Sequence, residues 1–158
     1  MLSINNKTAL LTSQGIQTLL LSSALMIFAT NSAVAKNSDT PIRFAQGQIS
    51  KTITGKLSPK QNEHWYKFNA SSWQYIVINI APLAGTAETA NVGVLQMPNG
   101  TQDGTKGGII YQGCLPATGE YRLRVARNLM VTQGKTAGYT VEVVVLPKSA
   151  SESLCEYL

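Results

Sequence analysis

The sequence predicts an all-β protein: an antiparallel β-sandwich of about seven or eight short strands behind an N-terminal leader. Apolar residues after residue 41 recur at every second position, which is the period of a strand and not of a helix. Turn residues such as Pro, Gly and Asn separate these runs. The 158 residues include 13 glycines and only 13% charged residues, a composition that suits short strands joined by turns. One domain is expected from this length.

Residues 1–35 are predicted to be a signal peptide. Lys7 and the amino terminus supply the positive charge, residues 19–29 form an apolar run, and Ala33-Val34-Ala35 places small residues before Lys36. Cleavage is expected between Ala35 and Lys36. A retained membrane anchor is the alternative, which the shortness of the apolar run disfavours. The protein is therefore expected to be periplasmic or secreted.

Residues 36–41 are expected to be a flexible start, and the β-domain is expected to cover residues 42–147. Its first three strands end before Pro59, at residue 70 and before Pro82. The side chains expected to face the core are Ile49, Ile53, Leu57, Tyr66, Phe68, Ala70, Ile76, Ile78 and Ile80. Residues 83–90 are expected to form a loop. They are also the only stretch in which a helix could have been overlooked.

The second half of the domain continues the same pattern. Residues 91–97 are predicted to form a strand that the turn at 98–100 closes, and 107–113 a short edge strand. After a turn at 116–119, alternation predicts buried positions at Tyr121, Leu123, Val125, Tyr139, Val141, Val143 and Val145, with a connection at 128–138. Residues 148–158 form a C-terminal tail.

The two cysteines, Cys114 and Cys155, both follow the leader. An oxidising compartment favours a disulfide between them, which would tie the tail to the sheet. The alternative is a reactive thiol at Cys114 working with His64. No helix N-terminus or basic cluster is visible that would lower the pKa of such a thiol.

The charge of the chain is mild and spread out. Lys7 is the only charged side chain before Lys36, so the chain after residue 35 keeps 12 basic and 8 acidic residues, a net charge of +4. A nucleic-acid-binding protein gathers its basic residues in one stripe, whereas these are scattered. Neither a nucleic-acid partner nor, after leader removal, a membrane partner is expected.

No catalytic constellation is visible, so the protein is expected to bind and not to be an enzyme. His64 is the only candidate base, and the chain has no Gly-x-Ser-x-Gly elbow. One histidine and scattered acids do not suggest a metal site, and residues 99–104 (NGTQDG) have one carboxylate, which favours a plain turn over a calcium loop. No cofactor is expected.

Two stretches resemble a known group of β-sandwiches. Residues 64–70 (HWYKFNA), together with 115–125 (LPATGEYRLRV) and the closing strand 138–145 (GYTVEVVV), resemble the pre-peptidase C-terminal domains of secreted bacterial peptidases. With the opening FAQG at 44–47, residues 42–146 resemble more closely the periplasmic inhibitors of goose-type lysozyme, which are small stand-alone exported sandwiches.

The resemblance implies a site. Bacterial lysozyme inhibitors carry a Ser-Gly-x-Tyr or Ser-Gly-x-x-Tyr loop that enters the lysozyme cleft, and here Thr118, Gly119 and Tyr121 match it, with threonine in place of serine. Arg124 and Arg127 match basic residues on the following strand. A guanidinium offers paired donors to the essential carboxylic acid of a lysozyme cleft. Arg127 is expected to reach the partner most readily because it follows the strand.

Each of these residues also has a plain structural interpretation. Thr118-Gly119 is ordinary turn chemistry, and Tyr121 suits a core position or a tyrosine corner. Arg124, like Arg122, alternates with core residues and so faces water. A net charge of +4 would not steer the domain towards a basic lysozyme, so the target would have to be neutral or acidic, or the contact local.

A second class of function stays open. A carbohydrate- or protein-binding adhesion module of the pre-peptidase type would show a row of exposed aromatic side chains. Trp65, Trp73 and Tyr75 are the candidates to stack on sugar rings, although a sandwich also buries such residues. Cell-wall glycan is therefore the alternative partner to a lysozyme.

Overall fold

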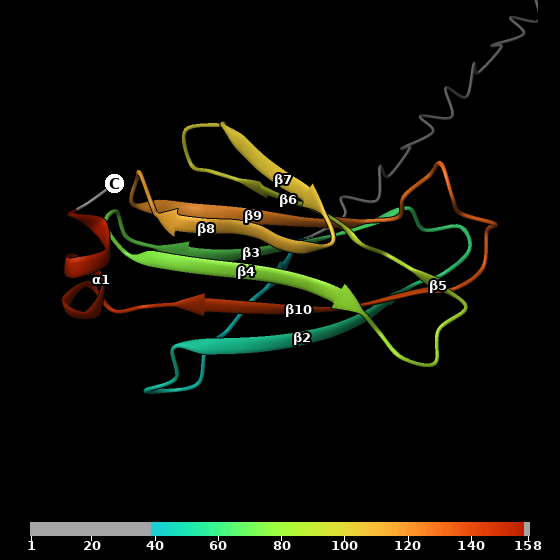
Figure 1. The fold of residues 1–158 in the computed structure, drawn as a ribbon, viewed down its shortest axis with the longest axis horizontal. Coiled ribbons are helices and arrows are strands. Elements are labelled where there is room, and N and C mark those ends of the chain that lie inside the picture. Colours follow the sequence, from blue (N-terminus) through green and yellow to red (C-terminus); the bar gives the residue numbers. More distant parts are fainter. Residues whose placement is uncertain (1–38, 157–158) are drawn as a thin grey trace, which may run out of the picture. The chain divides into compact units, whose positions relative to one another are not determined.

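A computed structural model describes residues 39–156, which form two β-sheets packed face to face and one short helix (Figure 1). The predicted all-β sandwich is confirmed. The signal peptide and the first residues of the flexible start lie outside the described residues. No helix within residues 39–156 has the length and apolar character needed to cross a membrane.

The first sheet has the strand order β1-β3-β9-β6-β7. These strands are β1 (Thr40–Pro41), β3 (Glu63–Ala70), β9 (Gly119–Ala126), β6 (Val92–Gln96) and β7 (Gln102–Lys106). β1 pairs in parallel with β3, and the other neighbours are antiparallel. Thr40 and Pro41, expected in the flexible start, thus belong to the sheet.

The second sheet has the order β2-β10-β4-β8. These strands are β2 (Ser50–Leu57), β10 (Ala137–Val145), β4 (Tyr75–Pro82) and β8 (Gly108–Cys114), and all three pairings are antiparallel. The two-residue strand β5 (Glu88–Thr89) pairs in parallel with the start of β10. The C-terminal strand β10 is therefore central in this sheet.

The core lies between the sheets and follows the predicted alternation. The side chains in it that are fully buried or nearly so include Tyr66, Phe68, Ile76, Ile78, Ile80, Tyr121, Leu123, Val125, Tyr139, Val141 and Val143. Each strand buries one face because successive side chains point to opposite sides. The prediction for Ile49 is wrong: it precedes the edge strand β2 and is 46% exposed.

Four elements were not predicted from the sequence: the two-residue strands β1 and β5, strand β7 and helix α1. The expectation that only residues 83–90 could contain a helix is wrong. Strand β7 carries the exposed polar residues QDGTK, so it shows no alternation. Helix α1 (Lys148–Cys155) buries only Ser151 and Cys155, so the tail lacks the apolar stripe that marks a helix. Residues 83–90 contain no helix.

The disulfide between Cys114 and Cys155 is confirmed, with 5.7 Å between the Cα atoms. It joins the end of β8 to the end of α1. These are the two cysteines of the chain, so neither is a free thiol, and the alternative of a reactive Cys114 is wrong.

Candidate functional site

The turn predicted at residues 116–119 lies at one end of the sandwich, beside the turn between β3 and β4. Thr118 is exposed, and its Oγ1 accepts a hydrogen bond from the backbone N–H of Ser72 at 2.9 Å and donates to Oγ of Ser72 at 3.2 Å. Backbone bonds also run from Trp73 N to Leu115 O (3.0 Å) and from Leu115 N to Gln74 O (2.9 Å). We call these two bonded turns, residues 71–74 and 115–119, the turn end.

A small hollow of about 240 Å³ separates the two turns. It is lined by Asn69, Ala70, Ser71, Gln74, Thr118 and Gly119. Gly119 is tightly packed, because a Cβ there would lie 3.0 Å from the ring of Pro98. The backbone at Gly119 is therefore closely packed, while the hydroxyl of Thr118 faces solvent.

Tyr121 stabilises the turn at residues 116–119 from the core. Its side chain is fully buried, and its hydroxyl donates to the carbonyl of Ala117 at 2.6 Å. Burial raises the pKa of the phenol, so it stays protonated and keeps donating. Of the roles considered for Tyr121 from the sequence, this geometry matches the tyrosine corner. Because the ring is buried, Tyr121 positions the turn and offers no surface to a partner in this conformation.

Trp73 also lies at the turn end, and the sequence assigned it no role in the inhibitor hypothesis, only a candidate role in stacking on sugar rings. Its side chain is 63% exposed. It is also the one non-glycine residue with positive φ (65°) in the described part of the chain. That left-handed conformation costs energy in a residue with a Cβ, so the surrounding bonds must hold it. The hydrogen bond from Trp73 N to Leu115 O does so.

The disulfide and helix α1 lie against this tryptophan. The Sγ atom of Cys155 contacts the carbonyl oxygen of Trp73 at 3.7 Å. Buried Ser151 accepts from the backbone N–H of Tyr75 at 2.9 Å, which docks the helix onto the start of β4. A hollow of about 540 Å³ opens here, lined by Trp73, Lys148, Glu152, Cys155 and Glu156. An indole, two carboxylates and one ammonium group thus share one surface.

Arg124 lies away from the turn end, on the outer face of the first sheet. Its guanidinium is 5.9 Å from the centroid of the Trp65 ring and forms an ion pair with Glu63 at 3.4 Å. Its Nε is buried without a hydrogen-bond partner. Arg122 packs more closely on the same ring, at 4.5 Å, and is bonded to Asp39. That bond holds the pKa of the Asp39 carboxyl below its usual value.

Arg127 is buried, contrary to the expectation that it reaches a partner. Only 4% of the residue is exposed. All five of its side-chain N–H groups are used: Nε bonds to Gln61 O, and the two terminal nitrogens bond to Glu88 and to the carbonyls of Leu57, Ser58 and Lys135 at 2.6 to 2.8 Å. The guanidinium therefore ties three segments together and is unavailable to a partner in this conformation. We call this arrangement the arginine clasp.

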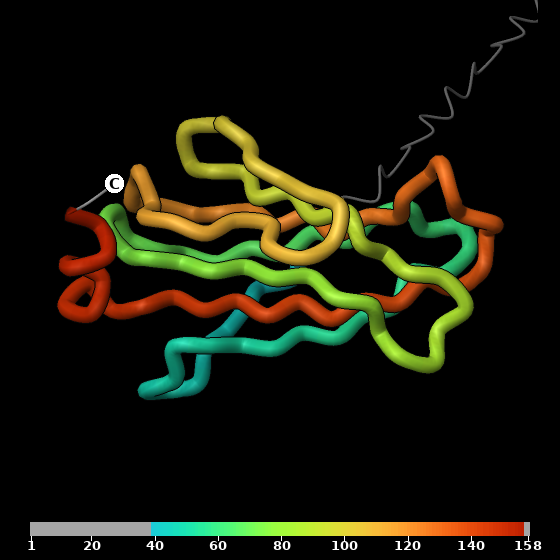
Figure 2. The backbone as a smooth tube through the Cα atoms, viewed as in Figure 1, coloured from blue at the N-terminus to red at the C-terminus, as the bar shows by residue number. Residues whose placement is uncertain are grey.

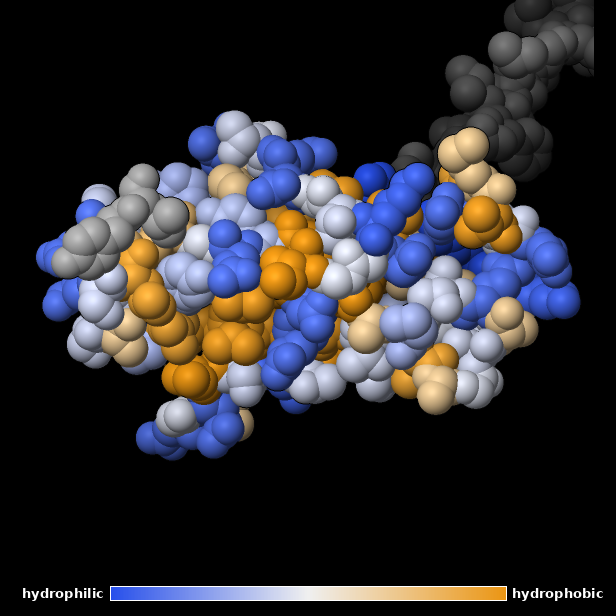
Figure 3. All heavy atoms as spheres, viewed as in Figure 1, coloured by the Kyte–Doolittle hydropathy of each residue, from blue (hydrophilic) through white to orange (hydrophobic). Residues whose placement is uncertain are grey.

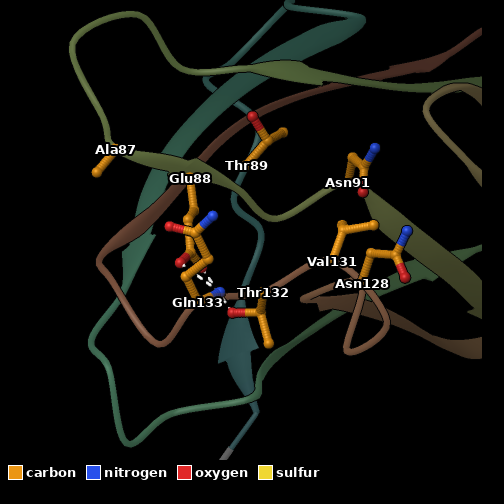
Figure 4. Close-up of a pocket in the computed structure, with 8 residues that line it drawn as sticks. All are labelled: Ala87, Glu88, Thr89, Asn91, Asn128, Val131, Thr132 and Gln133. Atoms are coloured by element: carbon orange, nitrogen blue, oxygen red, sulfur yellow. Dashed lines mark hydrogen bonds between the residues drawn. The ribbon is translucent and has the colours of Figure 1, made fainter.

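Glu88 is the acidic half of the clasp. Its carboxylate accepts from the hydroxyl of Thr132 at 2.6 Å and from the backbone N–H group of Gln133 at 2.8 Å (Figure 4). It also accepts from the backbone N–H group of Lys135 at 2.9 Å. These donors hold the pKa of Glu88 below its usual value, and the Thr132 hydroxyl has the largest effect. Glu88 is therefore ionised opposite Arg127 at neutral pH.

Strand β9 separates the predicted site residues. Thr118 precedes this extended strand and Arg127 follows it, so nine residues at about 3.3 Å each place them roughly 30 Å apart. Figure 2 shows the turn end beside α1 and the β9–β10 connection at the opposite end. Thr118 and Gly119 are together at one surface, whereas Arg127 belongs to another.

His64 belongs to a network of hydrogen-bonded hydroxyl groups. Its Nδ1 lies 3.0 Å from the hydroxyl of Tyr139, which bonds to the hydroxyl of Tyr66 at 2.6 Å, and its Nε2 lies 3.0 Å from Oγ1 of Thr40. Burial lowers the pKa of His64. Within the described residues, the hydrogen bonds of the His64 ring all run to hydroxyl groups, those of Tyr139, Tyr66 and Thr40. Among residues 39–156, no three His, Cys, Asp or Glu residues gather to hold a metal ion.

The three candidate sugar-stacking aromatics do not form a row. Trp65 lies under Arg122 on the outer face of the first sheet, whereas Tyr75 begins β4 in the second sheet and its hydroxyl accepts from Gln112 at 2.8 Å. Trp73 alone is largely exposed. The hypothesis that these three side chains form one flat aromatic platform is therefore wrong.

No family model matches the chain, and no curated protein sequence is similar to it. Solved structures are similar in fold. The periplasmic inhibitor of g-type lysozyme from Aeromonas hydrophila superposes with a TM-score of 0.54 at 19% identity, covering 69% of this chain and 96% of that one. The inhibitor from Salmonella Typhimurium gives 0.53 at 21% identity, covering 68% and 97%.

A mutant of the corresponding Escherichia coli inhibitor gives a TM-score of 0.51 at 22% identity, again covering 68% of this chain and 97% of that one. In all three cases nearly the whole of the inhibitor is matched by the described domain. At these identities the likeness concerns the fold. The domain therefore has the sandwich fold of the periplasmic inhibitors of g-type lysozyme.

Proposed function

We propose that the protein is an exported, non-enzymatic inhibitor whose turn end inserts into the active-site cleft of a lysozyme of the goose type. The observation that carries this proposal is the shared fold, which extends over 96–97% of the length of three inhibitors of that enzyme class. The exposed hydroxyl of Thr118 on a braced turn supports the position of the contact.

The residues at the turn end divide the work. Thr118 and Gly119 form the tip, and the Thr118 hydroxyl would redirect its one proton from Oγ of Ser72 to a cleft carboxylate. Trp73 supplies the apolar anchor, since exposed tryptophans on a rigid support dominate binding energy in many interfaces. Tyr121 holds the tip through Ala117. Arg124 is a peripheral contact at most, and Arg127 holds the far end of the domain.

The charges near the turn end differ in sign from the net charge of +4, which would not steer the domain towards a basic lysozyme. Helix α1 presents Glu152 and Glu156 beside Trp73, against the single Lys148. At the other side of the tip, Glu120 is paired with Lys67 at 3.1 Å. The surface that would meet the enzyme is thus slightly acidic, although the whole domain is basic. An encounter with a basic lysozyme would be favoured at this end.

The test is a titration of the exported protein into cell-wall lysis assays with goose-, chicken- and invertebrate-type lysozymes. Stoichiometric inhibition of one class is expected. Thr118→Ala and Trp73→Ala should weaken it, Trp73→Ala by about tenfold or more. The matched controls Thr54→Ala and Ile109→Ala replace an exposed threonine and an exposed apolar residue elsewhere and should leave inhibition unchanged. No inhibition of any class at micromolar excess would overturn the proposal.

One observation favours a second candidate, a carbohydrate-binding module. The hollow beside Trp73 combines an exposed indole with the carboxylates of Glu152 and Glu156, which is chemistry that stacks on a sugar ring and bonds its hydroxyls. Sedimentation with purified cell wall in the absence of any lysozyme tests this candidate. Retention that Trp73→Ala abolishes, together with no inhibition of a lysozyme, would favour it over the inhibitor.

A further inference from the structure

Three consecutive aliphatic side chains are exposed at the end of the domain opposite the turn end. Leu129, Met130 and Val131, in the connection between β9 and β10, are 63%, 88% and 71% exposed. We call them the apolar tip. Figure 3 shows apolar atoms standing out where Figure 1 places this connection. Runs of exposed aliphatic residues are rare on a monomer and mark a surface that contacts something else.

The tip is held in a defined turn. Oδ1 of Asn128 accepts from Met130 N at 3.3 Å, and the Asn128 carbonyl accepts from Val131 N at 3.0 Å and Thr132 N at 3.1 Å. At its base, the arginine clasp fixes Arg127 and Thr132 through Glu88. Figure 4 shows Asn128 and Val131 on one side of a polar hollow of about 340 Å³ and Glu88 on the other. The exposure is therefore a property of a bonded turn.

The charges around the tip are positive. Lys60 and Lys135 are exposed and lie in the two segments whose carbonyls the clasp binds. The neighbouring carboxylates Glu63 and Glu88 are already paired with Arg124 and Arg127. Of the ion pairs within residues 39–156, none includes Lys60 or Lys135. This end thus combines an apolar protrusion with uncompensated ammonium groups.

We propose that this end docks on an anionic lipid bilayer, with the apolar tip inserted at the level of the headgroups and Lys60 and Lys135 at the lipid phosphates. Aliphatic side chains flanked by lysines are the chemistry of shallow interfacial insertion. A symmetric contact with a second copy would bring the lysines of both tips together, which is unfavourable. The sequence alone predicted no membrane partner after leader removal, because the apolar run of the leader is too short to span a bilayer.

The proposal does not rest on lysozyme inhibition. Because the turn end lies roughly 30 Å away along β9, a domain docked by the apolar tip would hold the turn end clear of the lipid surface. Either activity can therefore fail without the other.

The test is co-sedimentation of the exported protein with vesicles of phosphatidylcholine alone and of phosphatidylcholine mixed with phosphatidylglycerol. Binding to the anionic vesicles only is expected. Met130→Gln should reduce the partition coefficient about tenfold, and Lys135→Gln about five-fold. The matched controls are Ile109→Gln, an exposed apolar residue on an edge strand, and Lys51→Gln, an exposed lysine at the far end of β2. Each should bind as the unchanged protein does.

Three results would overturn the proposal. The first is no sedimentation with anionic vesicles at low salt. The second is equal loss for Lys135→Gln and Lys51→Gln with none for Met130→Gln, which would indicate diffuse attraction of the whole basic domain. The third is concentration-dependent self-association that Met130→Gln abolishes, without vesicle binding, which would assign the tip to a second copy. Because Met130 is almost fully exposed, Met130→Gln should fold; Leu129→Gln repeats the test.

Discussion

Removing the disulfide should lower stability by an amount that the chain topology sets. The double variant Cys114→Ala/Cys155→Ala opens a loop that spans 41 residues in sequence. The loop-closure entropy that the unfolded chain then regains corresponds to about 4 kcal/mol at 25 °C. A domain of this size has an unfolding entropy of about 0.25 kcal/mol per degree, so the midpoint of thermal unfolding should fall by roughly 16 °C.

Circular dichroism of both proteins during heating measures this shift. Unchanged protein treated with a reductant should show the same shift, whereas Ser153→Ala, an exposed change in α1, should show none. The buried bonds of Ser151 to Tyr75 and Pro147 should keep α1 docked in the folded state, so the loss acts on the unfolded chain. A fall of less than about 4 °C would refute the reasoning, because it would mean that opening the loop adds little freedom to the unfolded chain.

Three further changes test the packing. Tyr121→Phe removes the bond to Ala117 O and should lower the free energy of unfolding in urea by about 1–2 kcal/mol, while unchanged stability would show that the hydroxyl does not hold the turn. Gly55→Ala would place a Cβ 2.2 Å from the Tyr139 hydroxyl and should cost about 2–3 kcal/mol, whereas Thr54→Ala beside it should cost little. Because burial lowers the pKa of His64 below 6.5 in the fold, the unfolded chain binds more protons as the pH drops through 6.5. Stability should therefore decrease between about pH 7 and pH 5, and His64→Asn should show a shallower decrease; identical pH profiles would contradict a role for this histidine.

The strands could be predicted because each one buries a single face. Alternation at Tyr66, Phe68 and Ala70, or at Tyr121, Leu123 and Val125, directly reflects burial between two sheets. Helix α1 could not be predicted in this way, since its fixation depends on a serine hydroxyl and a disulfide, and neither leaves a hydrophobic period.

The site was harder to predict because it depends on contacts between distant segments. Arg127 follows a strand and carries a charge, which in sequence indicates exposure. Its burial is decided by carbonyls at Leu57, Ser58 and Lys135, which no local pattern reveals. The exposure of Trp73 likewise follows from a backbone bond to Leu115, 42 positions further along the chain.

The central place of β10 has a consequence for the timing of folding. β2 and β4 both pair with this strand, which follows all the other described strands in the chain. The second sheet therefore cannot assemble until β10 has been synthesised. Pairing over such long separations is also slow. Until β10 is available, β2 and β4 lack the strand that joins them, so the second sheet is expected to form in one late step.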